Sequence, residues 1–369
     1  MGRTEDVRFA PSGRRLAFAC YADERIAVAD VEITRSASGP EIAVTSLELL
    51  QSPALHEPHG IDFVDDDTLV VGNRAGGIVP LRLPPPGVEG ELTPIDGGQP
   101  RLVDAPGSVA VRSLGDGRHE VLACDNWANT VTRHTLGGDG ALTAGEVIAR
   151  KWLDLPDGLA LSGDGHWLAV SNHNSHNVLV FAYPTVSEES DPVGILRGVH
   201  YPHGLRFVTG DRHLFVADAG APHVHVFAAS TGGWHGVGYP AAAIRVMDDE
   251  TFARGHVSPE EGGPKGIDVE PRTSVLAVTS ECQPLAFFDV APALDRSELD
   301  GVGESLIRYE LARLAETARI KAEAVDARAQ LTELVQTKAW RMTKPARRAY
   351  GAALRLKARR SHRRFSALP

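Results

Sequence analysis

The stretch "PHGLRFVTGDRHLFVADAGAPHVHVF", Pro202–Phe227, determines the fold expected for this chain. Leu205 and Phe207 alternate with other residues, as do Leu214 and Val216, and this two-residue period is that of a β-strand. The segment "TGD" between the two runs is typical of a tight turn, and "VHVF" supplies a third apolar run. The stretch therefore predicts a three-stranded antiparallel meander.

The meander is one copy of a repeat. Related segments are "EPHGIDF" from Glu57, "LPDGLAL" from Leu155 and "GPKGIDV" from Gly263, with a weaker copy from Ala105 and a copy lacking the glycine from Glu5. Successive copies start 46 to 62 residues apart, and a fourth apolar segment precedes most of them. Four strands at such a spacing are the signature of a β-propeller blade.

Six copies predict an all-β, six-bladed β-propeller of four-stranded antiparallel blades over residues 1–298. A single blade cannot bury both of its faces, so radial stacking in a closed ring completes the core. A β-sandwich does not explain the repeated phrase, and a β-helix repeat is shorter. The long interval between residues 204 and 266 leaves room for a seventh blade.

The repeats resemble two families. "PHGLRFVTGDRHLFVADAGAPHVHVF" looks like an NHL repeat, and "PDGLALSGDGHWLAVSNHN" is similar to the blades of gluconolactonase-like (SMP-30) propellers. The resemblance covers residues 5 to about 290 and implies six blades. It implies little about activity, because one fold hosts many functions.

Composition limits the function classes. The 369 residues carry a net charge of −10, yet residues 338–369 hold 11 basic and no acidic residues. The acidic propeller should therefore repel nucleic acid, whereas the tail should attract anions. Three cysteines, Cys20, Cys124 and Cys282, indicate no disulfide framework. Without an apolar signal segment or an 18-residue apolar run, the sequence favours a cytoplasmic protein.

Residues 299–369 are expected to form a second, helical part. An uninterrupted helix is expected over 304–338, with a narrow apolar stripe made of Ile307, Leu311, Leu314, Ala318, Ala322 and Val325. Such a stripe favours a coiled coil, giving a homo-oligomer, or docking on a partner. Packing on the chain's own propeller and disorder are the alternatives.

The basic segment 339–369 carries apolar anchors among its arginines. This pattern is typical of binding to an anionic membrane surface, with a protein partner or, less readily, RNA as alternatives. "KAWRMTKPARR", Lys338–Arg348, resembles a Trp-Arg-x-Thr-x-Pro segment of bacterial surface-polysaccharide glycosyltransferases and methyltransferases. Ala346 stands where those segments usually have leucine. The resemblance implies polysaccharide biosynthesis at the inner membrane face.

Two columns of polar residues should surround the channel mouth, because inner strands start and second strands end on one face of a propeller. The first column is Glu5, His59, Pro106, Asp157, His203 and Lys265. The second is Cys20, Asn73, Asp125, Asn172, Asp218 and Ser280, with Arg74, Asn126, Trp127, His173, Asn174 and Glu281 nearby. These residues are candidates for binding a small molecule or glycan; the alternative for both columns is that they cap turns and strand ends.

A more specific hypothesis for the first column is that it binds a divalent metal. Glu5, His59, Asp157 and His203 offer two carboxylates and two imidazoles, which suit zinc better than calcium. The carboxylates resemble the metal ligands of gluconolactonase-like propellers, and the histidines resemble the zinc ligands of a lyase related to NHL proteins. Lys265 argues against a metal and could instead bind an anionic ligand.

A long insertion, Asp248–Gly262, should lie at the same mouth as a lid, with His256, Glu260 and Glu261 as further candidate ligands.

The sequence as a whole leaves three possible functions open. The first is a ligand-binding or scaffold propeller, the second a metal-dependent lactonase-type hydrolase or lyase, and the third an RNA-associated propeller.

Overall fold

The structure is a computed structural model of the chain. It describes residues 2–86, 90–95, 102–208 and 210–294, and within the tail residues 319, 322–323, 325–330 and 332. The chain divides into two compact units, Met1–Glu310 and Leu311–Pro369. The expected domain boundary between residues 298 and 299 lies outside the described residues. No helix among the described residues is long and apolar enough to cross a membrane.

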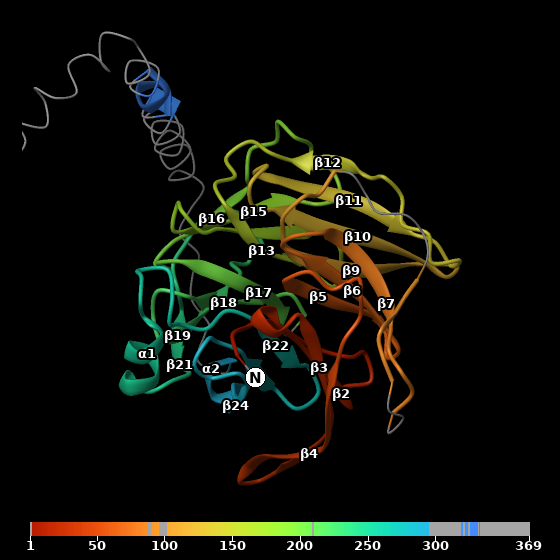
Figure 1. Cartoon of the computed structure of the whole chain (residues 1–369). Coiled ribbons are helices and arrows are strands. Elements are labelled where there is room, and N and C mark those ends of the chain that lie inside the picture. The colour runs from red at the N-terminus through yellow and green to blue at the C-terminus, as the bar shows by residue number, and fades with distance from the viewer. Residues whose placement is uncertain are drawn as a thin grey trace, which may run out of the picture. The chain divides into compact units, whose positions relative to one another are not determined.

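The first unit is a six-bladed β-propeller, as the repeats predicted (Figure 1). Blade one is β1 (Thr4–Phe9), β2 (Arg15–Cys20), β3 (Arg25–Ser36) and β4 (Gly39–Leu50), with the short 3-10 helix η1 (Tyr21–Asp23) between β2 and β3. Blade two is β5 (Pro58–Asp65), β6 (Thr68–Asn73), β7 (Gly77–Arg82) and β8 (Thr93–Pro94). Blade three is β9 (Pro106–Gly115), β10 (Arg118–Asp125), β11 (Thr130–Leu136) and β12 (Glu146–Ala149).

Of the remaining blades, blade five has four strands, blade four has five, and blade six has three among the described residues. Blade four is β13 (Pro156–Leu161), β14 (Trp167–Asn172), β15 (Asn177–Ala182) and β16 (Gly194–Leu196), and it gains a parallel fifth strand, β20 (Gly236–Gly238). Blade five is β17 (Pro202–Val208), β18 (His213–Asp218), β19 (His223–Ala228) and β21 (Ala242–Arg245). Blade six has three described strands, β22 (Ile267–Glu270), β23 (Val275–Val278) and β24 (Ala286–Asp289).

The long interval before blade six contains no further blade among the described residues. It is taken up by β20, which joins blade four, by β21, the outer strand of blade five, and by the short helix α1 (Asp249–Gly255). A second short helix, α2 (Ala291–Leu294), follows blade six.

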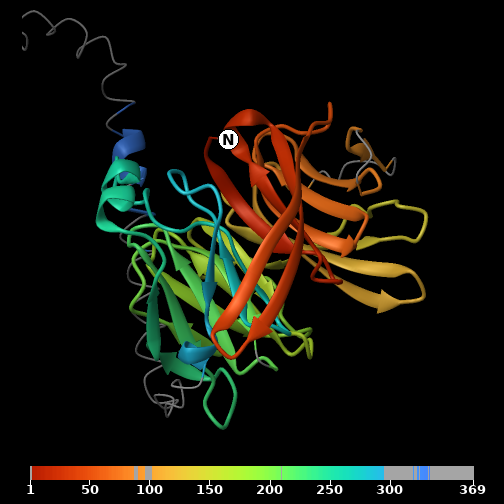
Figure 2. The same ribbon diagram turned by 90° about the horizontal axis from the view of Figure 1, so that it is seen from below.

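The ring closes through contacts between inner strands. Each of β1, β5, β9, β13, β17 and β22 contacts the next, and β22 contacts β1. Within residues 2–294, as far as the structure describes them, blades one and six share no strand. Side chains join them instead: Thr4 Oγ1 donates to the Ser280 carbonyl at 3.0 Å, and Arg35 pairs with both carboxylate oxygens of Asp289 at 3.0 and 3.1 Å. Figure 2 shows the tip of the β3–β4 hairpin, which carries Arg35, beside α2.

The glycine of the repeated phrase is required by this close packing. A Cβ atom on Gly60 would lie 2.5 Å from Ser108 Cα and 2.9 Å from Val109 N, in the neighbouring inner strand. Gly158, Gly204 and Gly266 meet the backbone of the next blade in the same way. Because backbone atoms cannot move aside, only glycine allows the inner strands to approach so closely.

Asp6 near the start of β1, and Asp62 and Asp268 toward the far end of their inner strands, bind neighbouring blades together. Each carboxylate accepts a backbone N–H from the next inner strand: Asp6 from Ile61 at 3.0 Å, Asp62 from Val111 at 2.7 Å and Asp268 from Phe9 at 2.7 Å. Asp62, Asp268 and Arg206 also line a pocket of about 280 Å³ at this end. Burial and the proximity of the other carboxylates raise the pKa of Asp62 to about 7, although Arg8 opposes the shift.

Of the tail, the described residues between 319 and 332 are helical, with an Arg319–Glu323 ion pair one turn apart. The rest of the expected helix 304–338 and the whole basic segment 339–369 lie outside the described residues. The helical tail, its coiled coil and its partners therefore remain predictions.

We expect Gly60→Ala to destabilise the propeller by about 1–3 kcal/mol, since the added methyl group overlaps the backbone of blade three. Urea unfolding followed by circular dichroism measures the loss. Gly163→Ala is the matched control, because a Cβ there meets its nearest neighbour, Asp211, at an ordinary 3.5 Å. Equal stability of the two variants would contradict the packing argument.

The raised pKa of Asp62 predicts the direction in which the free energy of unfolding changes with pH. Between the ordinary pKa of about 3.9 and the folded value of about 7, the folded protein holds a proton that the unfolded chain has lost. This group's contribution to stability therefore falls as pH rises, by up to about 1.4 kcal/mol per unit. From pH 5 to pH 8, wild type should lose stability relative to Asp62→Asn in urea unfolding. Asp139→Asn, in an exposed turn, is the control, and a pH-independent difference for Asp62→Asn would refute the prediction.

Candidate functional site

Each inner strand contributes one residue to the channel mouth, and together these are Glu5, His59, Gly107, Asp157, His203 and Lys265. The prediction of Pro106 for blade three is wrong by one position. Pro106 pairs with Asp125 as Pro58 pairs with Asn73, so the register places Gly107 in the column. A Cβ on Gly107 would lie 2.8 Å from Asp157 Oδ1, so this blade contributes backbone where the others contribute side chains.

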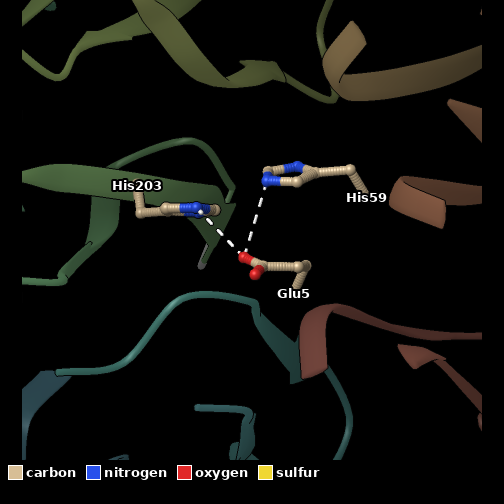
Figure 3. A group of neighbouring side chains, drawn as sticks. All are labelled: Glu5, His59 and His203. Carbon is tan, nitrogen blue, oxygen red and sulfur yellow. Dashed lines mark ion pairs between the residues drawn. The ribbon is translucent and has the colours of Figure 1, made fainter. Parts of the chain in front are cut away.

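Glu5 is fully buried, and its two carboxylate oxygens have different surroundings. Oε1 pairs with Arg3 and, at 3.4 Å, with Lys265 Nζ. Oε2 has no hydrogen-bond partner among the described residues and lies 3.5 Å from Nε2 of both His59 and His203 (Figure 3). Burial raises the pKa of Glu5, but Lys265, the histidines and Arg3 outweigh it and hold the pKa well below its usual range. Glu5 is therefore ionised.

The two histidines come from opposite blades and meet at the axis, as the repeat spacing predicted. Their rings stack with centroids 5.4 Å apart and planes 24° from parallel. His59 Nδ1 lies 2.6 Å from the Gly107 carbonyl oxygen, which can only accept, so Nδ1 carries the hydrogen and Nε2 presents a lone pair. Burial and Arg74 lower the pKa of His59 to about 4, and burial lowers that of His203 to about 3. Both imidazoles are neutral at pH 7.

Asp157 completes the group. Its Oδ1 accepts from Asn126 Nδ2 at 2.8 Å and from Arg74 Nη2 at 3.2 Å, while Oδ2 lies 3.1 Å from His203 Nε2. Burial raises the pKa of this carboxyl, but His203 and Arg74 hold it well below its usual range. The sequence predicted that Glu5, His59, Asp157 and His203 would lie close together, and the structure places them so.

The predicted lid loop reaches the site through one residue. Glu261 Oε2 lies 2.7 Å from Lys265 Nζ, and its Oε1 lies 3.2 Å from Arg3 Nη1. His256 instead bonds the Glu261 backbone carbonyl. Lys265 thus lies between the carboxylates of Glu5 and Glu261. These neutralise its positive charge, which would otherwise repel a metal ion.

Five members of the second column lie at the ends of second strands, as the repeats predicted, while Ser280 lies two residues beyond β23 and bonds the Gln283 backbone. The other polar side chains also bond local backbone. Asn73 accepts from His56 N, Asp125 from Asp104 N, Asn172 from Asp154 N, and Asp218 from His200 N and Tyr201 N. This is the capping role that was the alternative for these positions. A ligand role for these four side chains remains a prediction.

The other candidates differ in their distance from Glu5, His59, Asp157 and His203. Arg74 contacts two of these residues, and His173 Nδ1 lies 3.8 Å from Asp157 Oδ2. Burial lowers the pKa of Arg3, but Glu5, Glu261 and, least, Glu281 outweigh it and raise that pKa above its usual range. Trp127 is 71% exposed, with its backbone N–H bonded to Asp125.

Sequence reasoning missed Arg3 entirely. The repeat aligned Glu5 with the first column, but no repeat position corresponds to a partner two residues earlier. Asn126 was placed near the site, whereas its bond to Asp157 could not be foreseen. The Asn126 contact depends on the distance between blades three and four, whereas the Arg3–Glu5 contact lies within blade one, just before the repeated phrase.

The donor set fits a divalent cation. Within the described part of the chain, Glu5, His59 and His203 are the one group whose ligand atoms all lie within 4.8 Å of one another. Two neutral imidazoles and a carboxylate are the ligands of many catalytic zinc sites. The carbonyl of Gly107 orients His59, and Arg3 and Lys265 hold the far oxygen of Glu5, as partners of metal ligands commonly do.

No protein-family model matches the sequence, and no curated protein is significantly similar to it. Solved structures show the same architecture. A luciferin-regenerating enzyme is 15% identical, with a TM-score of 0.50 over 81% of this chain and 89% of that chain. A putative 6-phosphogluconolactonase from Bacteroides uniformis is 12% identical, with a TM-score of 0.50 over 81% and 83%. The chain is thus a six-bladed β-propeller, and these similarities concern its fold alone.

Proposed function

We propose that the channel mouth binds a divalent cation, of zinc type, through Glu5, His59 and His203. The observation that carries this proposal is the buried Glu5 Oε2, which has no donor among the described residues and faces two imidazole Nε2 atoms at 3.5 Å. A buried anionic oxygen without a hydrogen bond is costly unless a cation neutralises it.

Asp157 suits the role of fourth ligand better than that of general base. Its Oδ2 lies beside His203 Nε2, and its strongly lowered pKa makes it a weak proton acceptor near neutral pH. Asn126 and Arg74 fix the other oxygen, and so orient Oδ2 toward the donor set.

We further propose a metal-dependent hydrolase of small esters, of the lactonase type. A bound cation would supply a Lewis acid and an activated water at neutral pH. The chain would supply Arg74, whose guanidinium lies beside His59 and Asp157 and could stabilise developing negative charge. Two solved neighbours are described as a luciferin-regenerating enzyme and a putative 6-phosphogluconolactonase, but this similarity concerns fold, so the proposal rests on the donor set.

We expect purified protein equilibrated with zinc and desalted to retain one equivalent of metal, measured by mass spectrometry of the element. Glu5→Gln and His203→Ala should weaken zinc binding by more than roughly tenfold, since even partners of metal ligands contribute that much. His166→Ala, whose side chain is 69% exposed, is the matched control.

Wild-type protein without zinc, or zinc retained in a His59→Ala/His203→Ala double variant, would contradict the metal site. Stoichiometric zinc without turnover of a panel of lactones would instead leave the ligand-binding function and remove the hydrolase.

The tail carries a separate proposal, which rests on sequence alone. We propose that residues 338–369 dock the protein on the cytoplasmic side of an anionic membrane surface. There it would lie beside enzymes of surface-polysaccharide synthesis, some of which carry a segment similar to Lys338–Arg348. Eleven basic residues supply attraction of about 1 kcal/mol each near such a surface.

We expect full-length protein to float with vesicles that contain anionic phosphatidylglycerol, and residues 1–337 alone to remain unbound. Vesicles of neutral phosphatidylcholine are the control. Equal flotation of the two proteins would refute membrane docking through the tail, and binding of RNA in its place would favour the third function.

A further inference from the structure

Arg74 donates a hydrogen bond to His59 Nε2, the ring nitrogen through which His59 would bind a metal. We propose that cation binding releases Arg74 from His59 and turns it toward a ligand, so that the site takes an anion bearing a carboxylate or phosphate group together with the metal. This inference rests on the proposed metal site and names the substrate class of that site.

The first step concerns a single lone pair. His59 Nδ1 donates to the Gly107 carbonyl at 2.6 Å, so Nε2 is the only ring nitrogen that can accept. Arg74 Nη2 lies 2.6 Å from Nε2 and donates to it. One lone pair cannot serve both a guanidinium N–H and a metal ion. A cation bound to His59 must therefore displace Arg74 from this nitrogen.

The second step concerns charge. The cluster around the mouth holds four carboxylates, Glu5, Asp157, Glu261 and Glu281, and three side-chain cations, Arg3, Arg74 and Lys265. His59 is neutral, because its Nδ1 donates to Gly107 while its Nε2 accepts from Arg74. A divalent cation adds two positive charges and turns the single net negative charge of this cluster into a single net positive charge. Excess charge in a buried site is costly, so the loaded site favours a ligand that brings negative charge.

The third step identifies which side chain receives the anion. Arg3 and Lys265 are each held by both Glu5 and Glu261, and the Lys265 side chain is 3% exposed. Arg74 is 17% exposed and, once released from His59, keeps one carboxylate contact, to Asp157 Oδ1 at 3.2 Å. Its planar guanidinium matches the two oxygens of a carboxylate or phosphate.

The experiment compares wild type with Arg74→Ala and Arg74→Lys, using full-length protein. Isothermal titration with zinc measures metal affinity. Titration of the zinc-loaded, desalted protein with acetate or with methyl phosphate measures anion affinity and separates the two anion classes. Arg118→Ala is the matched control, because Arg118 is exposed and pairs with the exposed Asp116.

We expect opposite changes in the two affinities. Zinc should bind Arg74→Ala about three- to tenfold more tightly, because a competing hydrogen bond is gone. The anion should bind zinc-loaded Arg74→Ala at least roughly tenfold more weakly, since a charge-assisted pair is lost. Arg74→Lys should recover part of the anion affinity, and the control should match wild type in both titrations.

Failures are distinguishable. Zinc binding that depends on Glu5 and His203 but does not tighten in Arg74→Ala, or anion affinity unchanged by the variant, would overturn this inference and leave the metal site intact. No zinc binding in wild type or in any Arg74 variant would overturn the metal site and this inference with it. Zinc binding by Arg74→Ala alone would support the competition at His59 and refute a resident metal in the native protein.

Discussion

The close approach of six inner strands is the constraint on which the rest of the structure depends. Around the axis, neighbouring strands lie so near that a Cβ on Gly60 would stand 2.5 Å from Ser108 Cα. This proximity leaves each blade room for one residue at the channel mouth. Side chains from opposite blades therefore meet, and His59 and His203 stack although 144 residues separate them in sequence.

Burial at the mouth then dictates the electrostatics. A carboxylate as deeply buried as Glu5 is stable only with charged partners, and Arg3 and Lys265 supply them on one oxygen. The other oxygen faces two neutral imidazoles, which carry no charge to offset that of the carboxylate but are common zinc ligands. Burial lowers the pKa of both histidines and so keeps them neutral, which is the form in which an imidazole binds a metal.

The two ends of the inner strands use charge differently. At the mouth, residues from several blades converge on one point. Asp6, next to Glu5, and Asp62 and Asp268, toward the other end, are instead bound by backbone N–H groups of the next strand, so each carboxylate joins two blades. Among the described residues, the ring closes between blades one and six by such contacts and by Arg35 with Asp289, without a shared strand.

The sequence by itself determined the strand pattern, six repeats and the meeting of Glu5, His59, Asp157 and His203, because a strand period and a repeated glycine are local signals. The structure decided that the long interval before blade six holds no seventh blade among the described residues. Only the tertiary structure decided that Gly107 replaces Pro106 in the column, that β20 joins blade four, and that Arg74 bonds His59. The two-residue period of the strands does not show where a β-bulge shifts the pairing register between two strands. The contacts of Arg3 and Glu261 depend on chain segments more than 250 residues apart, whose spacing is fixed when the ring closes.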